Sequence, residues 1–335
     1  MHEFALMHAV MNMKAYSLQS HDFTEMQDAL SAWDHDYRQV SAGAFQGSLL
    51  HSQIGSLGIF HNRWERAIHY RGSAPKGTIG LAVTLAQTTN AIWNGHQMAF
   101  DDVLLQRAGA EAEYFSASLW DSVVFAIPET QLAKLISDLT NDNPEKILAG
   151  HGIYRLTSQF AAQIRQACIA YLRSVKRSLE RPAETSRLSE MAESVVELLA
   201  CALVYSQYQH GNKLGLTRQR ALVRRARDYA EESMAQPLQI SQLCRDLDTS
   251  ERTLHHAFLH QTGMAPLSFF KTARLNQAYR LLSNADPVGT LIKDIALTTG
   301  FRQFGQFSRD YRKLFGELPS ETLRSNRTFA KLPPV

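Results

Sequence analysis

Six polar side chains in the last third of the chain have the types and spacings that suit contact with the edges of DNA bases. Gln pairs well with adenine and Arg with guanine when a helix presents them to the major groove. The six candidate base-reading residues are Arg252, His255, His256, Gln303, Gln306 and Arg309. Basic residues beside them suit phosphate contacts. These phosphate candidates are Lys271, Arg302, Arg312 and Lys313. A solvated helix face is the alternative interpretation for the whole set.

The segments that carry these residues form a degenerate repeat. The apolar spacing of residues 240–247 recurs 52 residues later in residues 292–299. Each copy predicts a short helix, a turn and a second helix, and two such units in one chain can enter two successive major grooves of DNA. A long helix between the units, at about 1.5 Å per residue, would span roughly 25 Å. The predicted helices are 217–234, 240–247, 251–261, 266–282, 291–298 and 303–315.

Charge is distributed unevenly along the 335 residues. The net charge is only +3, but from Lys213 onward there are 19 Lys and Arg against 11 Asp and Glu. The front of the chain is therefore acidic and the back is basic. This asymmetry places the electrostatic footprint of a nucleic-acid partner on the back alone.

The front of the chain predicts an antiparallel β sandwich or barrel followed by helices. An amphipathic helix is expected over residues 22–40. Short β runs punctuated by Gly or Pro then fill residues 46–127. Pro128 opens a helix, and two longer helices, 154–179 and 187–209, predict an antiparallel hairpin. Residues 209–217 predict a linker. The fold class is thus α+β, with an all-α C-terminal domain.

Several classes of function are disfavoured by the residues present. The three cysteines form no CxxC pair, so neither a zinc site nor a disulfide framework is expected. No apolar run reaches the length of a membrane span, and no basic signal-peptide region precedes the first apolar stretch. A cupin metal centre needs an H-x-H pair, which the sequence lacks, so we expect no metal, no cofactor and no enzymatic activity. Four residues could line an effector pocket, with core or strand-surface placement as the alternative: Trp64, Arg66, Trp93 and His96.

The last 105 or so residues carry a specific motif string. It reads Ser250-x3-Leu254-x3-Phe258-x4-Gly263-x2-Pro266, then Gly300-Phe301, then Phe307-Ser308-Arg309 and Phe315-Gly316-x2-Pro319-Ser320. This string resembles the AraC/XylS family of transcription regulators, from which it departs at Tyr311 and Arg312. The resemblance implies two helix–turn–helix units joined by one helix, and a variable N-terminal domain that senses an effector and often dimerises. A string from Trp33 to Gly47 is similar to the ethanolamine-operon regulator branch, but it implies no effector.

Together these observations predict a cytoplasmic, sequence-specific DNA-binding regulator, most simply an activator that acts with RNA polymerase. The expected domains are 1–210, a cupin-like sensing and dimerisation domain, a linker at 211–216, and a DNA-binding domain at 217–327. A coiled-coil-like stripe predicts a homodimer, with packing inside its own domain as the alternative. Its residues are Leu188, Met191, Val195, Leu198, Ala202 and Tyr205. Two other functions stay open: a cupin-type enzyme or ligand-binding domain fused to a DNA anchor, and an effector-independent regulator.

Overall fold

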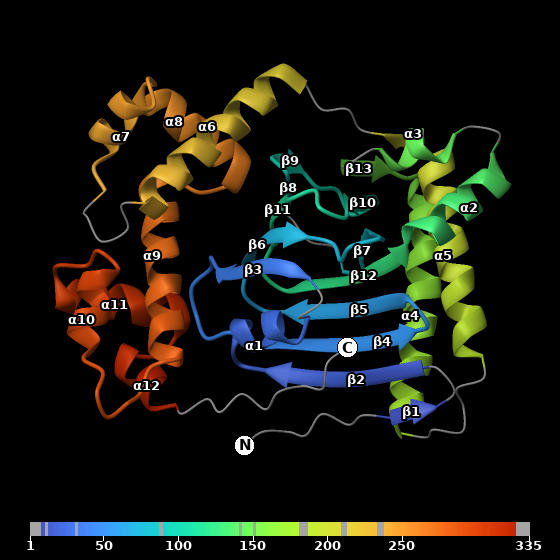
Figure 1. The fold of residues 1–335 in the computed structure, drawn as a ribbon, viewed down its shortest axis with the longest axis horizontal. Helices are drawn as coiled ribbons and strands as arrows, with labels where there is room; N and C mark the ends of the chain where they lie inside the picture. Colours follow the sequence, from blue (N-terminus) through green and yellow to red (C-terminus); the bar gives the residue numbers. More distant parts are fainter. Residues whose placement is uncertain are drawn as a thin grey trace.

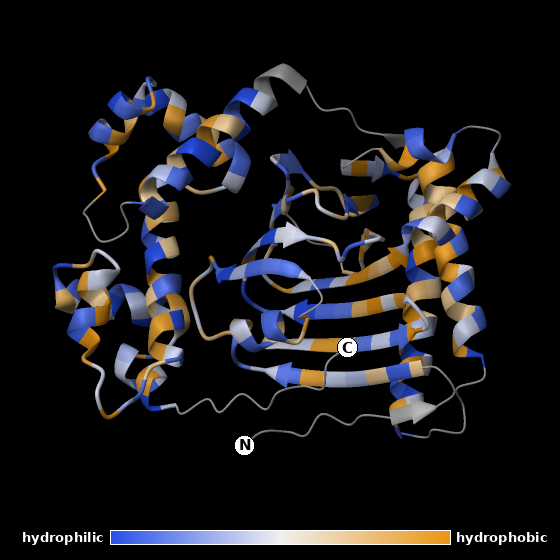
Figure 2. Ribbon diagram, in the orientation of Figure 1, coloured by the Kyte–Doolittle hydropathy of each residue, from blue (hydrophilic) through white to orange (hydrophobic). Residues whose placement is uncertain are grey.

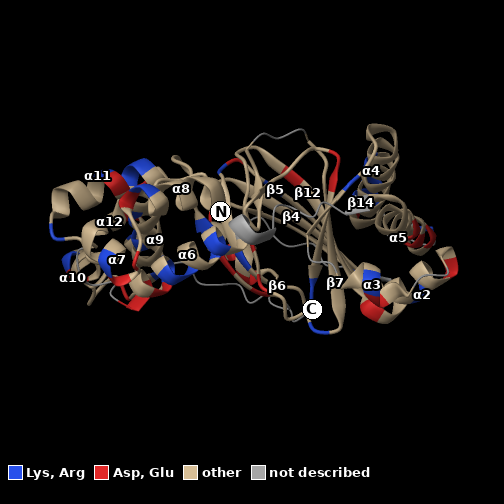
Figure 3. Ribbon diagram, turned by 90° about the horizontal axis from the view of Figure 1, so that it is seen from above, with Lys and Arg blue, Asp and Glu red and all other residues tan. Residues whose placement is uncertain are grey.

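The computed structural model of the chain has two antiparallel sheets in its N-terminal part and a helical domain in its C-terminal part (Figure 1). Two long helices lie on one side of the sheets, and the helical domain lies on the other (Figure 3). The structure describes residues 8–10, 13–30, 33–86, 90–140, 143–149, 152–180, 187–208, 213–232 and 238–325.

The larger sheet contains nine strands within the described residues, in the order β1-β2-β4-β5-β12-β7-β10-β13-β14. Every neighbouring pair is antiparallel. In chain order, the strands are β1 (His8–Val10), β2 (Met13–Ser20), β4 (Gly47–Ile54), β5 (Leu57–Trp64), β7 (Thr78–Thr84), β10 (Asp102–Arg107), β12 (Trp120–Pro128), β13 (Gly152–Arg155) and β14 (Gln207–Tyr208).

The smaller sheet contains five strands in the described part of the chain, in the order β3-β6-β11-β8-β9, again all antiparallel. They are β3 (Asp34–Gln39), β6 (Ile68–Ser73), β8 (Ile92–Trp93), β9 (His96–Gln97) and β11 (Ala112–Phe115). Successive side chains of a strand point to opposite faces. One face of this sheet is turned toward the larger sheet, and the other toward the helical domain.

Helices cover the outer face of the larger sheet. The helices α4 (Ser158–Glu180) and α5 (Leu188–Tyr205) form an antiparallel pair, with α2 (Glu129–Leu139) and α3 (Pro144–Leu148) beside them. Apolar residues of α4 and α5 share one core with alternate residues of the strands, such as Ile59, Leu81 and Phe125 (Figure 2). The opposite set of alternate residues forms a second core between the two sheets, which continues into the helical domain.

The C-terminal domain consists of seven helices among the residues that the structure describes. They are α6 (Lys213–Glu232), α7 (Ile240–Asp246), α8 (Glu251–Thr262), α9 (Pro266–Ser283), α10 (Ile292–Thr298), α11 (Phe304–Phe315) and α12 (Pro319–Arg324). Local signals fix their ends. The Ser250 side chain accepts a hydrogen bond from the Thr253 amide, and Gly263 ends α8 with a φ of 71°, a conformation that favours glycine.

The helical predictions for the C-terminal region are confirmed to within a few residues, and α4 and α5 form the expected hairpin. One N-terminal prediction is wrong. Residues 22–40 do not form one helix, because α1 covers only Phe23–Asp28 and Asp34–Gln39 form β3. Backbone pairing of β3 with β6 and packing against the C-terminal domain outweigh the local helical spacing. The predicted linker lies partly outside the described residues, and α6 begins inside it, at Lys213.

Candidate nucleic-acid interface and ligand pocket

The first helix pair, α7 and α8, presents its predicted base-reading residues to solvent. Leu254, Ala257 and Phe258 are buried in the core of this unit. The face on the other side of α8 exposes Arg252, His255 and His256. The register that the sequence predicts for α8 is therefore confirmed, and the three candidate side chains are exposed.

The second helix pair, α10 and α11, repeats this arrangement. Phe307 and Tyr311 are buried, and the Tyr311 hydroxyl donates to Thr322 Oγ1 at 2.8 Å. Gln303, Gln306 and Arg309 are exposed on the opposite face of α11. Arg309 Nη2 donates to Gln306 Oε1 at 2.9 Å. This hydrogen bond holds two of the candidate side chains together on one turn of the helix.

The four phosphate candidates are all exposed, and Lys and Arg are spread over the helices of this domain (Figure 3). Arg302, Arg312 and Lys313 flank the exposed face of α11. Lys271 lies on α9 and forms an ion pair with Asp310 at 3.3 Å. A phosphate at Lys271 would therefore compete with a carboxylate.

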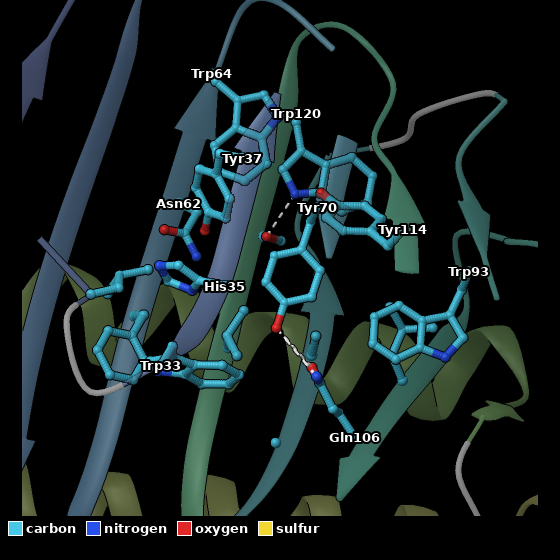
Figure 4. Close-up of a pocket in the computed structure, with 17 residues that line it drawn as sticks. Trp33, His35, Tyr37, Asn62, Trp64, Tyr70, Trp93, Gln106, Tyr114 and Trp120 are labelled. Atoms are coloured by element: carbon cyan, nitrogen blue, oxygen red, sulfur yellow. Dashed lines mark hydrogen bonds between the residues drawn. The ribbon is translucent and has the colours of Figure 1, made fainter. Parts of the chain in front are cut away.

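A pocket lies between the two sheets (Figure 4). The empty space among its lining residues is about 630 Å³, which includes space open to solvent, whereas the centre of a water-sized sphere can reach only about 70 Å³ of it. Eight of its seventeen lining residues carry Trp, Tyr or Phe rings, most of them on strands of the two sheets. They are Trp33, Tyr37, Phe60, Trp64, Tyr70, Trp93, Tyr114 and Trp120.

Two of the four residues predicted to line an effector pocket lie in the wall of this pocket, whose occupant stays a prediction. Trp64 and Trp93 belong to the wall, whereas Arg66 and His96 do not. Arg66 Nε instead donates to the Ala44 carbonyl at 3.0 Å, and His96 lies half-buried on β9. The sequence analysis did not predict the other wall residues. The alternate positions Trp120, Ser122 and Val124 on β12 were a usable signal, because alternate residues of a strand share one face.

Two polar residues join β3 to α9. Gln39 N donates to Asn276 Oδ1 at 2.8 Å, and Asn276 Nδ2 donates back to the Gln39 carbonyl at 2.9 Å. Both residues are 1% exposed. Arg280, one turn further along α9, donates to Asp36 Oδ1 at 2.5 Å and to the Tyr37 carbonyl at 2.6 Å. The end of α9 is thus bonded to a strand whose opposite face lines the pocket.

A buried charged group joins β11 to α6. Glu113 accepts hydrogen bonds from His69 Nε2 at 2.8 Å and from Arg227 Nη1 at 2.7 Å. Burial alone would raise the pKa of Glu113, but the His69 hydrogen bond and the nearby positive charges lower it to about 2. Burial also lowers the pKa of His69, so that its imidazole is neutral and donates to the Glu113 carboxylate.

The described part of the chain contains no group of three or more His, Cys, Asp or Glu side chains that could hold a metal ion. Nor does any helix there combine the length and apolar character needed to cross a membrane.

Some known proteins match only the C-terminal domain of this chain, and others match most of its length. Residues 243–325 match the family described as a helix-turn-helix domain. The probable thc operon regulatory protein of Rhodococcus erythropolis is 36% identical over 104 residues, 31% of each chain. The XylDLEGF operon transcriptional activator of Pseudomonas putida is 24% identical over 303 residues, 87% of this chain and 88% of the relative.

Two solved structures align with parts of this fold. The AraC-like transcriptional activator CuxR is 15% identical, with a TM-score of 0.42, over 85% of this chain and 99% of its own. The DNA-binding domain of AdpA, in complex with a target DNA, is 27% identical, with a TM-score of 0.29, over 32% of this chain and 92% of its own. The chain thus has a helix-turn-helix domain at residues 243–325, and along most of its length it is similar to transcription regulators of the AraC/XylS type.

Proposed function

We propose that the protein is a sequence-specific transcriptional activator in which α8 and α11 enter two successive major grooves of one DNA site. The observation that carries this proposal is the pair of equivalent exposed faces, on α8 and α11, with α9 between them. The 18 residues of α9 span roughly 27 Å at 1.5 Å per residue, which approaches one turn of DNA. The units are thus held near the spacing that two neighbouring grooves require.

Within this proposal, the two kinds of exposed side chain have different roles. Arg252, His255, His256, Gln303, Gln306 and Arg309 contact base edges, so they set the sequence that is read. Lys271, Arg302, Arg312 and Lys313 contact phosphates, so they add affinity that depends on salt. The Arg309–Gln306 hydrogen bond supports the assignment, because it fixes a guanidinium fork beside an amide before DNA arrives.

The N-terminal domain, in this proposal, is the sensor, and the pocket between its sheets is the effector site. The smaller sheet lines the pocket with Tyr37, Tyr70 and Tyr114. Its opposite face meets the C-terminal domain through neighbouring residues such as Asp36 and Glu113. A ligand that displaces a tyrosine therefore moves the strands that hold α9 and α6. It alters DNA binding only if its affinities for the two arrangements differ.

The homodimer also remains a proposal, but its surface is smaller than the sequence stripe predicts. Leu188, Val195 and Ala202 are buried in the domain's own core. Met191 and Leu198 are half-buried, and Tyr205 is 70% exposed, at intervals of seven residues on α5. These three residues form the part of the stripe that a second copy could cover. RNA polymerase is the further partner that an activator needs at its promoter.

The test is selection of binding sites from random DNA by the pure chain, followed by footprinting of the selected duplex. We expect two protected major-groove segments whose centres are about one helical turn apart. Protection of a single groove, or no enrichment of any sequence, would contradict the two-unit proposal. An effector-independent regulator, the second candidate, predicts that no small molecule shifts the thermal midpoint of the chain.

A further inference from the structure

The effector pocket contains no charged side chain among the described residues that line it. Burial raises the pKa values of Tyr37 and Tyr70 above the usual phenol range, so both are neutral donors or acceptors. A carboxylate here would lose its hydration without gaining an Arg or Lys, and an ammonium group would gain only cation–π contacts with the rings and no Asp or Glu to balance its charge. The wall therefore favours an uncharged occupant.

The shape and composition of the wall favour a flat ring. Phe60, Trp64 and Trp120 come from the larger sheet, and Tyr37, Tyr70 and Tyr114 come from the smaller sheet opposite. A planar aromatic molecule between the sheets meets ring faces and edges on both sides, which is the arrangement that aromatic pairs prefer.

Several polar groups of the pocket are already paired. Trp120 Nε1 donates to Ser122 Oγ at 2.8 Å, and Trp64 Nε1 donates to Ser116 Oγ at 3.0 Å. Gln106 Nε2 donates to the Gly72 carbonyl at 2.7 Å. These groups hold the wall in place and leave little capacity for a ligand.

Two buried acceptors in the wall have no hydrogen-bond partner among the described residues. Asn62 Oδ1 is one, on a side chain that is only 5% exposed. His35 Nδ1 is the other. His35 Nε2 lies 2.9 Å from the Gln27 carbonyl, which can only accept, so Nε2 carries the proton and Nδ1 presents a lone pair. Figure 4 draws both residues on the same side of the pocket.

A buried donor, Trp33 Nε1, and the Tyr114 hydroxyl, which can donate or accept, are also without a hydrogen-bond partner among the described residues. Leaving a buried acceptor unpaired is costly, so a ligand that donates to Asn62 or His35 gains more than one that only accepts. An ether, an ester or a carboxylate offers no proton to either acceptor. A phenol or an aromatic N–H compound does.

We propose that the pocket binds an uncharged, planar aromatic compound bearing a hydroxyl or ring N–H group, which donates a hydrogen bond to Asn62 Oδ1 or His35 Nδ1. This inference rests on the proposed role of the N-terminal domain as the sensor. It adds the chemical class of the effector: phenol-like, and neither a benzoate-like anion nor a quaternary ammonium cation.

The chain supplies its own reporter for a test. All four of its tryptophans line the pocket, namely Trp33, Trp64, Trp93 and Trp120. The tryptophan fluorescence of the pure full-length chain therefore reports only on the surroundings of the pocket. Four probes are titrated: para-cresol, its methyl ether, para-toluate and benzyltrimethylammonium. We expect para-cresol to change the tryptophan emission in a saturable way. The methyl ether should bind about tenfold more weakly, because it has no hydrogen-bond donor. The two ions should bind more weakly than the ether.

A variant assigns the acceptor. Asn62→Leu keeps the branched shape and the number of side-chain heavy atoms and removes the acceptor, so para-cresol should bind about tenfold more weakly while the ether keeps its affinity. Asn284→Leu, the same change at an exposed position after α9, should alter neither affinity. An equal loss of both ligands in Asn62→Leu would mean that Asn62 only packs against the ring, and the assignment would be wrong.

The inference is overturned if para-toluate or the quaternary ammonium binds as tightly as para-cresol. It is equally overturned if the methyl ether matches the phenol, or if no neutral aromatic probe gives a saturable response. The titrations need no DNA, so their result is separate from the footprint that tests the proposed regulator.

Discussion

Asn276→Leu should weaken the attachment of the C-terminal domain to the N-terminal domain. Asn276 satisfies both the backbone N–H and the backbone carbonyl of Gln39, and both residues are almost fully buried. A leucine would leave a donor and an acceptor unpaired, at about 1 to 3 kcal/mol each, so the expected loss is roughly 3 kcal/mol. An unfolding entropy of about 2 cal/mol/K per residue converts that loss into a midpoint lowered by about 4 °C.

Scanning calorimetry on the full chain and on fragment 213–335, each with and without Asn276→Leu, measures this loss. The fragment lacks Gln39, so the substitution should change its stability by no more than about 0.5 kcal/mol, as for a surface position. Tryptophan emission, which arises only from the N-terminal domain, shows whether that domain is affected too. Equal losses in chain and fragment, or no loss in either, would refute the docked arrangement.

Three predictions concern the DNA-binding surface and the dimer. Fragment 213–335 should bind DNA without the rest of the chain, and its affinity, measured by fluorescence anisotropy, should fall steeply as the salt concentration rises. A binding constant that does not change with salt would contradict the proposed phosphate contacts. Arg309→Ala should cost about 1 to 3 kcal/mol at one base pair, whereas Lys313→Ala should weaken all sequences alike; equal losses on specific and random DNA would remove Arg309 from base reading. Leu198→Glu should make a dimeric chain monomeric yet folded in sedimentation equilibrium; a wild-type chain that stays monomeric with and without effector rules out the α5 surface.

The C-terminal helices were predictable because their signals are local. Ser250 and Gly263 mark the two ends of α8, and the apolar spacing within 251–261 fixes which side is buried. The exposure of Arg252 follows from that spacing, and the exposure of Arg309 follows in the same way from the buried positions Phe307 and Tyr311 on α11. Such features need no knowledge of distant parts of the chain.

The pocket was only partly predictable because it depends on two sheets meeting. The sequence predicts Trp64 as a pocket residue, but the other wall residues Tyr37 and Tyr114 are 27 and 50 positions away along the chain. Trp33 lies within the predicted helix over residues 22–40. In the structure it instead precedes β3 and faces the pocket, since nonlocal strand pairing outweighs the local pattern.

Acid should loosen the contact between β11 and α6, and the sign follows from two pKa values. The pKa of Glu113 is lowered from 4.5 to about 2, so its stabilising contribution is complete above pH 4.5 and is lost as the pH falls toward 2. The pKa of His69 is lowered from 6.5, mainly by burial, so protonation of the unfolded chain already reduces stability below pH 6.5. Both groups therefore favour the folded state at neutral pH.

The Glu113 shift corresponds to on the order of 3 kcal/mol between pH 5 and pH 2. Glu113→Gln keeps the size of the side chain and removes the charge, so its free energy of unfolding should fall less steeply over that range than that of the wild type. Urea unfolding at a series of pH values measures both slopes. Parallel curves would show that the Glu113 carboxylate is not held by His69 and Arg227 in solution, and the link between the effector-binding sheet and α6 would lose its charged contact.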